Sequence, residues 1–415
     1  MASLALELPA TEPVAVHVEP SAAPAAGESA ILGTYKRAPV TFVRGEGAEL
    51  FDTQGRAYLD FTSGIAVTAL GHADPGVEGA IRGALASGLL HVSNLYGNEP
   101  GERLARFLVE RASFASKVFF CNSGAEANEG AFKFVRRWAR AVDGATSAKH
   151  EIVALRGAFH GRTLGVLAAT DRPNYRSPFR PLAGGISIVE RDLELIGATI
   201  SPETTAAVIV EPVQGEGGVR VLDAGWLREL RALTRERQVA LVFDEIQCGL
   251  GRTGHFFACE GVGVEPDVLT LAKPLAGGLP MGAVLLSAEI AAAVQPGDHG
   301  TTFGGGPFVS TVALHVAERL ADPALLAHVR EDGAWLGEAL RAMAERTGRV
   351  RAVRGAGFMW GIDTTAPAAD VVRASLERGL LLVTAGEHTV RLLPPLTMTR
   401  DELARGLAVL EEAVQ

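Results

Sequence analysis

The sequence predicts an α/β protein with a mostly parallel sheet in a large domain and a smaller α+β domain. Three runs, residues 152–155, 206–210 and 239–243, are nearly continuous in apolar residues, which is typical of strands covered on both faces. Strand-like and helix-like segments alternate from about residue 77 to residue 300, as a parallel sheet with crossover helices requires. A chain of 415 residues is long enough for more than one hydrophobic core, so two domains are expected.

The chain is expected to divide into four parts. Residues 1–30 are rich in alanine, proline and glutamate and contain no lysine or arginine, so a disordered extension is predicted rather than a secretory or transit peptide. Residues 31–75 should contribute to the small domain, and residues 76–305 should form the large domain. Residues 306–415 should form the rest of the small domain.

Apolar spacing predicts the helices. Leu104, Phe107 and Leu108 share one face of a helix expected at residues 102–111, and a later candidate around residues 226–233 has the same pattern. In the carboxyl-terminal part the expected helices cover residues 323–346, 368–378 and 400–412, around short strands at residues 350–362, 380–383 and 390–393.

Composition excludes several classes of protein. The net charge of −9 is spread along the chain without a basic run, which argues against nucleic acid or an anionic membrane as a partner. No apolar run reaches the roughly 18 residues that a membrane span needs. Cys121, Cys248 and Cys259 show neither metal-site nor disulfide spacing, so no metal is expected and a reducing cytoplasm is predicted.

A single lysine follows a predicted buried strand. Residues 267–272 read as that strand, and Lys273 is the only charged residue after Asp267 before the flexible Gly277 and Gly278. Desolvation disfavours an ammonium ion, which lowers the pKa and frees the amine to attack a carbonyl. Lys273 is therefore a candidate Schiff-base lysine, although most such lysines only point to solvent.

Two further strand ends carry polar groups. Asp244 ends the run at residues 239–243, where open α/β sheets bind ligands. After a strand at residues 117–121, Ser123 and Glu126 have capping-box spacing before a helix that continues to about residue 140, and Gly124 allows a ligand to approach the backbone. This helix start either binds a phosphate or merely caps the helix. A phosphate site, an acid and a Schiff-base lysine together indicate pyridoxal phosphate, whose ring nitrogen the acid would keep protonated.

At this point the chain resembles the class III (ω-amino) pyridoxal-phosphate aminotransferases. The resemblance covers roughly residues 33–412, and nine segments carry it in order and spacing: residues 93–96, 122–128, 159–163, 211–218, 244–247, 251–254, 270–273, 300–305 and 391–396. It implies fold type I and a homodimer with shared active sites. Gly97 and Gly306 depart from the residues common in the family, which affects expectations about substrate preference and loop order but not about the reaction.

The resemblance implies a role for each matching residue. Lys273 would hold the cofactor and shuttle a proton as acid and base, and Asp244 would pair with the ring nitrogen. Phe159 would stack on the ring, and Thr302 would reach the cofactor phosphate from the second subunit. The remaining cofactor-binding positions are Ser123, Gly124, Ala125, Glu211 and Gln247.

Two arginines are expected to recognise substrate carboxylates, because a planar guanidinium suits bidentate binding. The resemblance assigns the carboxylate far from the reacting amine to Arg162 and the α-carboxylate of glutamate to Arg391. Glu216 would mask Arg391 when only one carboxylate is present, and Thr301 would lie near the substrate. Glu216 could instead form a loop salt bridge, as could Arg252, and His160 is interpreted as structural.

Three functions remain open from the sequence. The favoured one moves the terminal amino group of N2-acetyl-L-ornithine, or of a close ω-amine, to 2-oxoglutarate, in arginine and possibly lysine biosynthesis. Succinylornithine, ornithine, 4-aminobutyrate and a carrier-bound lysine satisfy the same charge pattern. A glutamate-semialdehyde aminomutase is the second function, against which Arg391 and Glu216 argue, and a non-catalytic cofactor-binding module is the third.

Overall fold

The computed structural model describes residues 29–144 and 148–415, and the chain divides into two compact units after Thr41. In the first unit, the described residues 29–41 form neither helix nor strand and are almost all exposed. The extension predicted at residues 1–30 falls almost entirely outside the described residues. The second unit, Phe42–Gln415, contains every helix and strand that follows.

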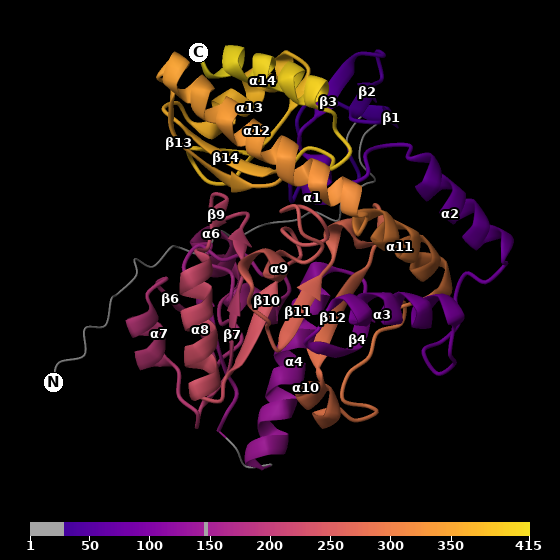
Figure 1. Ribbon diagram of the computed structural model, residues 1–415, viewed down its shortest axis with the longest axis vertical. Helices are drawn as coiled ribbons and strands as arrows, with labels where there is room; N and C mark the ends of the chain where they lie inside the picture. Colours follow the sequence, from indigo (N-terminus) through magenta and orange to yellow (C-terminus); the bar gives the residue numbers. More distant parts are fainter. Residues whose placement is uncertain (1–28, 145–147) are drawn as a thin grey trace, which may run out of the picture. The chain divides into compact units, whose positions relative to one another are not determined.

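A seven-stranded sheet occupies the middle of the second unit (Figure 1). Its order is β4 (Ala115–Cys121), β12 (Gly282–Ser287), β11 (Val268–Leu271), β10 (Ala240–Asp244), β7 (Thr205–Val210), β5 (Glu151–Leu155) and β6 (Ile186–Val189). All neighbouring pairs from β11 to β6 are parallel, whereas β12 is antiparallel to both β11 and β4. The prediction of an α/β fold with a mostly parallel sheet is therefore confirmed.

Both faces of this sheet are covered, which explains the apolar strands. Every residue of β7, β10 and β11 is buried. Along β10, Leu241 and Phe243 join one core cluster, whereas Val242 joins the cluster on the other side. Because successive side chains point to opposite faces of a strand, a strand between two cores needs apolar residues at every position.

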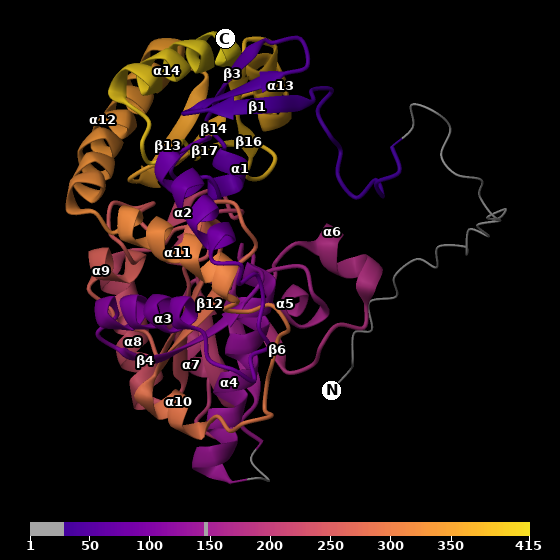
Figure 2. The same cartoon turned by 90° about the vertical axis from the view of Figure 1, so that its right-hand side faces the viewer.

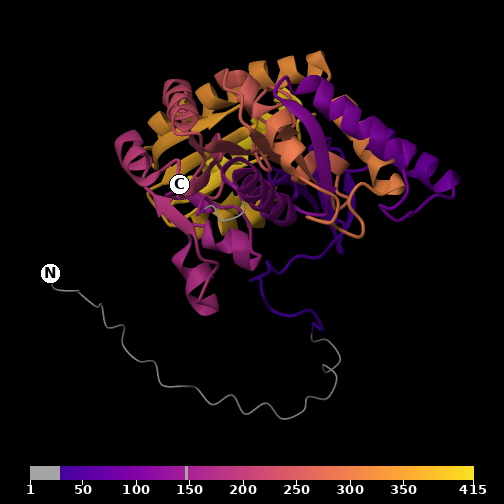
Figure 3. The ribbon, with the colours of Figure 1, turned by 90° about the horizontal axis from the view of Figure 1, so that it is seen from below.

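Helices flank the sheet and connect its strands. They are α3 (Glu99–Arg111), α4 (Gly124–Asp143), α7 (Leu193–Thr199), α8 (Ala224–Glu236), α9 (Ala258–Val262) and α10 (Ala288–Ala293), with shorter turns at α5 (Leu164–Ala168), α6 (Pro173–Arg176), η1 (Ser177–Phe179) and η2 (Lys273–Ala276). Helix α11 (Pro307–Leu320) lies against α2 (Pro75–Ala86) and α3 (Figure 2, Figure 3).

The carboxyl-terminal part is built on smaller sheets. One contains β13 (Val350–Ala356), β14 (Met359–Thr364), β17 (Thr389–Leu392) and β16 (Val383–Thr384) and packs against α12 (Pro323–Thr347) and α13 (Ala368–Glu377). Helix α14 (Arg400–Val414) lies against α12 and α13. Another joins β1 (Phe42–Glu46), β2 (Glu49–Asp52) and β3 (Ala57–Asp60) to β15 (Leu380–Leu381). The short elements α1 (Ser63–Ala66), β8 (Val213–Gln214) and β9 (Arg220–Val221) complete the unit. The predicted domain boundaries stay a prediction.

Strand direction concentrates chemistry at one edge of the large sheet. Because β12 is antiparallel to both of its neighbours, β4 runs in the same direction as β11. Strands β4, β5, β7, β10 and β11 therefore all end at the same edge, and the segments that follow them carry the predicted site residues.

None of the helices in the described ranges has the length and apolar composition needed to cross a bilayer.

Candidate functional site

A cavity of about 390 Å³ opens at the carboxyl edge of the sheet. Its lining contains nine of the residues predicted from the sequence: Ser123, Gly124, Ala125, Phe159, Arg162, Glu211, Asp244, Gln247 and Lys273. Four other predicted residues, Glu216, Thr301, Thr302 and Arg391, lie outside that lining. The carboxyl edge of the sheet, predicted as the ligand site, thus contains a cavity lined by several polar groups, as a small-molecule site requires.

Lys273 enters the cavity from the first residue of η2, directly after β11. Its backbone φ of 24° lies in a region that residues other than glycine rarely adopt. Such backbone strain is concentrated at functional sites. Surrounding protein desolvates the ammonium, which together with the positive charge of Arg391 lowers the pKa of Lys273 to about 8. About a tenth of this amine is therefore neutral and nucleophilic at pH 7, far more than for an ordinary lysine.

Asp244 is held by two buried donors. Its Oδ2 accepts a hydrogen bond from Asn128 Nδ2 and one from His160 Nδ1, both at 2.7 Å, and its Oδ1 accepts from the backbone N–H of Ile246 at 3.1 Å. Burial opposes a charge on His160, but the hydrogen bond and negative charge of Asp244 raise the pKa of this histidine above its usual value. The carboxylate is thereby fixed in orientation at the end of β10.

Glu211 follows β7 and adds a second buried carboxyl group. It accepts hydrogen bonds from the backbone N–H groups of Phe159 at 2.9 Å and Gly215 at 3.3 Å. Burial is the main reason that the pKa of Glu211 is raised to about 7; the charge of Asp244 also raises it, and the charge of His160 lowers it. Two carboxyl groups in one small cavity disfavour simultaneous ionisation.

The amino end of α4 forms one wall of the cavity. Ser123 is the N-cap, and its hydroxyl accepts the backbone N–H of Glu126 at 3.2 Å. The reciprocal half of a capping box is displaced by one residue, because the Glu126 carboxylate accepts from the backbone N–H of Asn122 at 2.7 Å. A Cβ at Gly124 would meet the Ile246 side chain at 2.9 Å. Free N–H groups and the positive end of the helix dipole make this wall an anion site.

Arg391 on β17 is masked by an acid. Its side chain is 1% exposed, and one terminal nitrogen lies 2.7 Å from Glu216 Oε1. The other terminal nitrogen donates to Gln247 Oε1 at 2.9 Å. Since Glu216 retains 25% side-chain exposure, this carboxylate has room to move away and uncover the guanidinium. Glu216 does form a salt bridge, and its partner is the predicted substrate-binding arginine.

Arg162 lies exposed at the edge of the same cavity. Its guanidinium carbon is 3.2 Å from the centre of the Tyr175 ring and 5.9 Å from that of Phe159. Within the described ranges no carboxylate forms an ion pair with it. Arg391 is thus masked by Glu216, whereas the guanidinium of Arg162 is exposed at the cavity.

Thr301 and Thr302 lie on the segment before α11. Thr301 Oγ1 accepts from Asn122 Nδ2 at 2.9 Å, and Asn94 Nδ2 donates to the Thr301 carbonyl at 2.7 Å. Thr302 is exposed. The proposed contact of Thr302 with a second subunit stays a prediction.

Sequence reasoning missed three residues with contacts to the site. Asn128 is fully buried and also accepts from Thr270 Oγ1 at 2.8 Å, so it ties Asp244 to β11. His160, interpreted as structural, contacts Asp244 directly. Tyr175 has no sequence signal at all, whereas Asn128 lies one helical turn after Gly124 and could have been found from that spacing. Arg252, a candidate loop salt bridge, donates instead to the carbonyls of Phe358 and Pro394.

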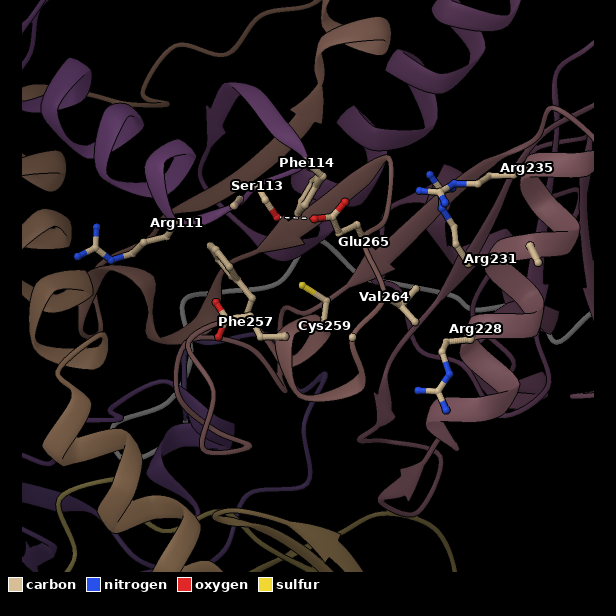
Figure 4. Close-up of a pocket in the computed structure, with 14 residues that line it drawn as sticks. Arg111, Ser113, Phe114, Arg228, Arg231, Arg235, Phe257, Cys259, Val264 and Glu265 are labelled. Atoms are coloured by element: carbon tan, nitrogen blue, oxygen red, sulfur yellow. Dashed lines mark hydrogen bonds between the residues drawn. The ribbon is translucent and has the colours of Figure 1, made fainter.

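A second cavity, of about 500 Å³, is separate from this chemistry. Arg228, Arg231 and Arg235 extend from α8 on one side of it, and Arg111 lies at the end of α3 on the other (Figure 4). Glu265, which precedes β11, belongs to its lining, whereas Lys273 follows β11, so the two cavities lie at opposite ends of this strand. No predicted site residue lines it, and the described ranges contain no cluster of acids, histidines or cysteines suited to a metal ion.

Comparisons with known proteins agree with this geometry. Residues 33–414 match the model of the family described as Aminotransferase class-III. The mitochondrial acetylornithine aminotransferase of Alnus glutinosa is 46% identical over 92% of this chain and 84% of its own length. The solved N-acetylornithine aminotransferase of Stenotrophomonas maltophilia is 36% identical, with a TM-score of 0.80 over 92% of this chain and 96% of that one. The ornithine aminotransferase of Toxoplasma gondii, whose active site is described as partly occupied by PLP, is 31% identical, with a TM-score of 0.86 over 92% of both chains.

Proposed function

We propose that this chain, which belongs to the class III aminotransferase family, moves the terminal amino group of N2-acetyl-L-ornithine or a close ω-amine to 2-oxoglutarate, yielding the semialdehyde and L-glutamate. The observation that carries the proposal is the pair of unequal arginines beside Lys273. Arg391 is masked by Glu216 at 2.7 Å, whereas Arg162 has no acidic partner within the described residues. This substrate supports a place in arginine biosynthesis, and three cysteines without disulfide spacing support the cytoplasm.

The cavity suits pyridoxal phosphate. Its residues include a lysine of lowered pKa and a buried acid. They also include the amino end of α4, where Gly124 avoids the clash that a Cβ would make with Ile246. Lys273 would bind the aldehyde carbon covalently, Asp244 the ring nitrogen, Phe159 a ring face and Gln247 the region of the phenolic oxygen. Ser123, Gly124 and Ala125 would hold the phosphate through the α4 amino end. When bound, this cofactor supplies an electron sink for the carbon that carries the amino group.

The chain's own residues then control protons and water. Lys273, with a pKa lowered to about 8, is suited to accept a proton from the substrate carbon and return it. Asp244 would keep a proton on the ring nitrogen, and hydrogen bonds from Asn128 and His160 hold its carboxyl group in place for that role. Glu211 supplies a second buried carboxyl group beside this pair.

The two arginines account for the use of two different substrates. N2-acetylornithine carries one carboxylate and a neutral acetamide, so it needs Arg162 available and Arg391 masked. Glutamate carries two carboxylates, and its α-carboxylate would displace Glu216 from Arg391. Since an unmasked Arg391 would attract the wrong carboxylate, Glu216 provides specificity by occupying its guanidinium.

Glutamate alone tests the reaction class. When glutamate is added to purified protein loaded with pyridoxal phosphate, the cofactor should change to its amino form, which absorbance measures. One equivalent of 2-oxoglutarate per site should be released, which a coupled dehydrogenase measures. An aminomutase releases no external keto acid, and a non-catalytic binding module changes neither signal. Either result would refute amino transfer.

A panel of amines tests the substrate. We expect kcat/KM for N2-acetylornithine to exceed that for 4-aminobutyrate or free ornithine by at least about tenfold, roughly 1.4 kcal/mol of discrimination. Arg162→Ala should remove most of this difference. Higher kcat/KM with succinylornithine, 4-aminobutyrate or a carrier-bound lysine would reassign the substrate within the same family.

The active unit is proposed to be a homodimer with shared sites. Thr302 is exposed and does not line the cavity of its own subunit, which supports a role in the site of a partner. Thr301 would lie near the substrate in that arrangement.

A further inference from the structure

We infer that Tyr175 is a specificity-determining residue that holds Arg162 in position to read the distal carboxylate of the substrate; this rests on the proposed function. The Arg162 guanidinium carbon lies 3.2 Å from the centre of the Tyr175 ring. This is a close cation–π contact, which attracts the guanidinium to the ring face. No residue assigned to the site from the sequence performs this task.

The geometry leaves the useful part of Arg162 uncovered. An aromatic ring covers a face of the guanidinium plane, whereas the N–H groups project along the edges of that plane and stay available to a carboxylate. Arg162 itself is exposed and forms no ion pair within the described ranges. An exposed arginine has many rotamers, so a ring that restricts it lowers the entropy lost when substrate binds.

The segment that carries Tyr175 is hydrogen-bonded to Glu216, the residue that masks Arg391. Tyr175 lies on the single turn α6, and Arg172 is the residue just before that turn. The Arg172 side chain donates to the backbone carbonyls of Glu216 and Asp171. Asp171 in turn accepts the backbone N–H of Gly157 at 2.8 Å. One short segment therefore contacts both Arg162, through Tyr175, and the backbone of Glu216, through Arg172.

Positioning predicts an effect that depends on the substrate. Tyr175→Leu should lower kcat/KM for N2-acetylornithine by about three- to fivefold, within the range of a cation–π contact at an exposed arginine. It should change kcat/KM by less than about twofold for N-(4-aminobutyl)acetamide, which has the same amine and acetamide but no carboxylate. A general folding defect would lower both equally.

Matched variants complete the experiment. Tyr175→Phe keeps the ring and should retain most of the activity, and Phe179→Leu removes an aromatic ring that is 56% exposed on the neighbouring turn η1. Combining Tyr175→Leu with Arg162→Ala should cost little more than Arg162→Ala alone, because the ring acts through the arginine. Equal losses for both amines, or fully additive losses in the double variant, would overturn the inference.

The outcome is separable from the proposed substrate. If the wild-type protein does not use N2-acetylornithine, the proposed substrate fails, and the comparison is made between 4-aminobutyrate and propylamine, which has the same amine but no carboxylate. A Tyr175→Leu effect restricted to the carboxylate-bearing amine would still support the inference. An effect on neither amine would refute it whichever substrate is used.

Discussion

At the residue scale, the site depends on groups whose properties are set by their neighbours. Two donors meet Asp244 Oδ2 at 2.7 Å and fix the orientation of its carboxyl group. At Lys273, desolvation and the charge of Arg391 together outweigh the nearby carboxylates and lower the pKa to about 8. A carboxyl group of fixed orientation and an amine of lowered pKa are suited to different steps of the same reaction.

The pKa of Lys273 is directly testable. In cofactor-free protein the unreactive ammonium should predominate below pH 8 and the free amine above it. Acetylation of Lys273 by acetic anhydride should therefore rise with a midpoint near pH 8, against about 10.4 for an ordinary lysine. Peptide mapping by mass spectrometry reads the rate, with exposed Lys117 as a reference in the same digest. A midpoint above pH 10 would contradict desolvation of this amine.

Replacing the acid tests its proposed contact with the ring nitrogen. Asp244→Asn should leave the cofactor bound but slow turnover by several orders of magnitude, because a neutral amide cannot hold a proton on that nitrogen. Absorbance measures occupancy, and steady-state kinetics measure kcat. Asp370→Asn, on the surface of α13, is the matched control. Near-wild-type kcat in Asp244→Asn would mean that another group protonates the ring.

At the element scale, the site residues are positioned by the ends of strands and by the start of a helix. Lys273, Asp244 and Glu211 each follow or end a fully buried strand, so the rigid sheet fixes where their backbones lie. The amino end of α4 faces the same cavity. Functional groups on rigid elements keep their geometry better than groups on free loops, because the core holds the elements in register.

The α4 wall predicts a cost for a single methyl group. Gly124→Ala would place a Cβ 2.9 Å from the Ile246 side chain, and overpacking of this kind costs about 1–3 kcal/mol. Cofactor affinity should fall as well, because Ile246, which lines the cavity, would have to move. Urea unfolding of cofactor-free protein and cofactor titration measure the two effects.

Another helical glycine provides the comparison. A Cβ added to Gly79 in α2 would meet no heavy atom within 4 Å. Gly79→Ala should be neutral or stabilising by roughly 0.5–1 kcal/mol, because alanine favours the helix. If the two variants behave alike, the space around Gly124 does not limit binding.

At the scale of the whole molecule, the question is how many chains build one site. Lys273 reaches the cavity of its own chain, whereas Thr302 lies outside that lining. If Thr302 serves a partner, each active site combines residues of two subunits, and lesions on different subunits can be brought together in one site.

Subunit mixing tests this arrangement. Lys273→Ala and Thr302→Ala proteins should form heterodimers with one doubly impaired site and one intact site, so activity should recover beyond the sum of the separate proteins. Native mass spectrometry verifies exchange. No recovery despite verified exchange would place Thr302 in the site of its own chain.

The sequence by itself determined the sheet and the positions at its edge. Continuous apolar runs at residues 206–210 and 239–243 are typical of strands between two cores. Parallel strands bring their carboxyl ends together. Lys273 and Asp244 were predicted at that edge for this reason. Resemblance to a family added the roles of Arg391 and Glu216, which no local pattern indicates.

Only the tertiary structure decided the contacts between distant segments. Asn128 and His160 meet on one oxygen of Asp244, although 116 and 84 positions separate them from it. Tyr175 reaches Arg162 through an irregular segment with little periodic signal. Local propensity reports what each segment prefers alone, whereas side-chain contacts depend on how the segments pack, and that packing is a property of the whole chain.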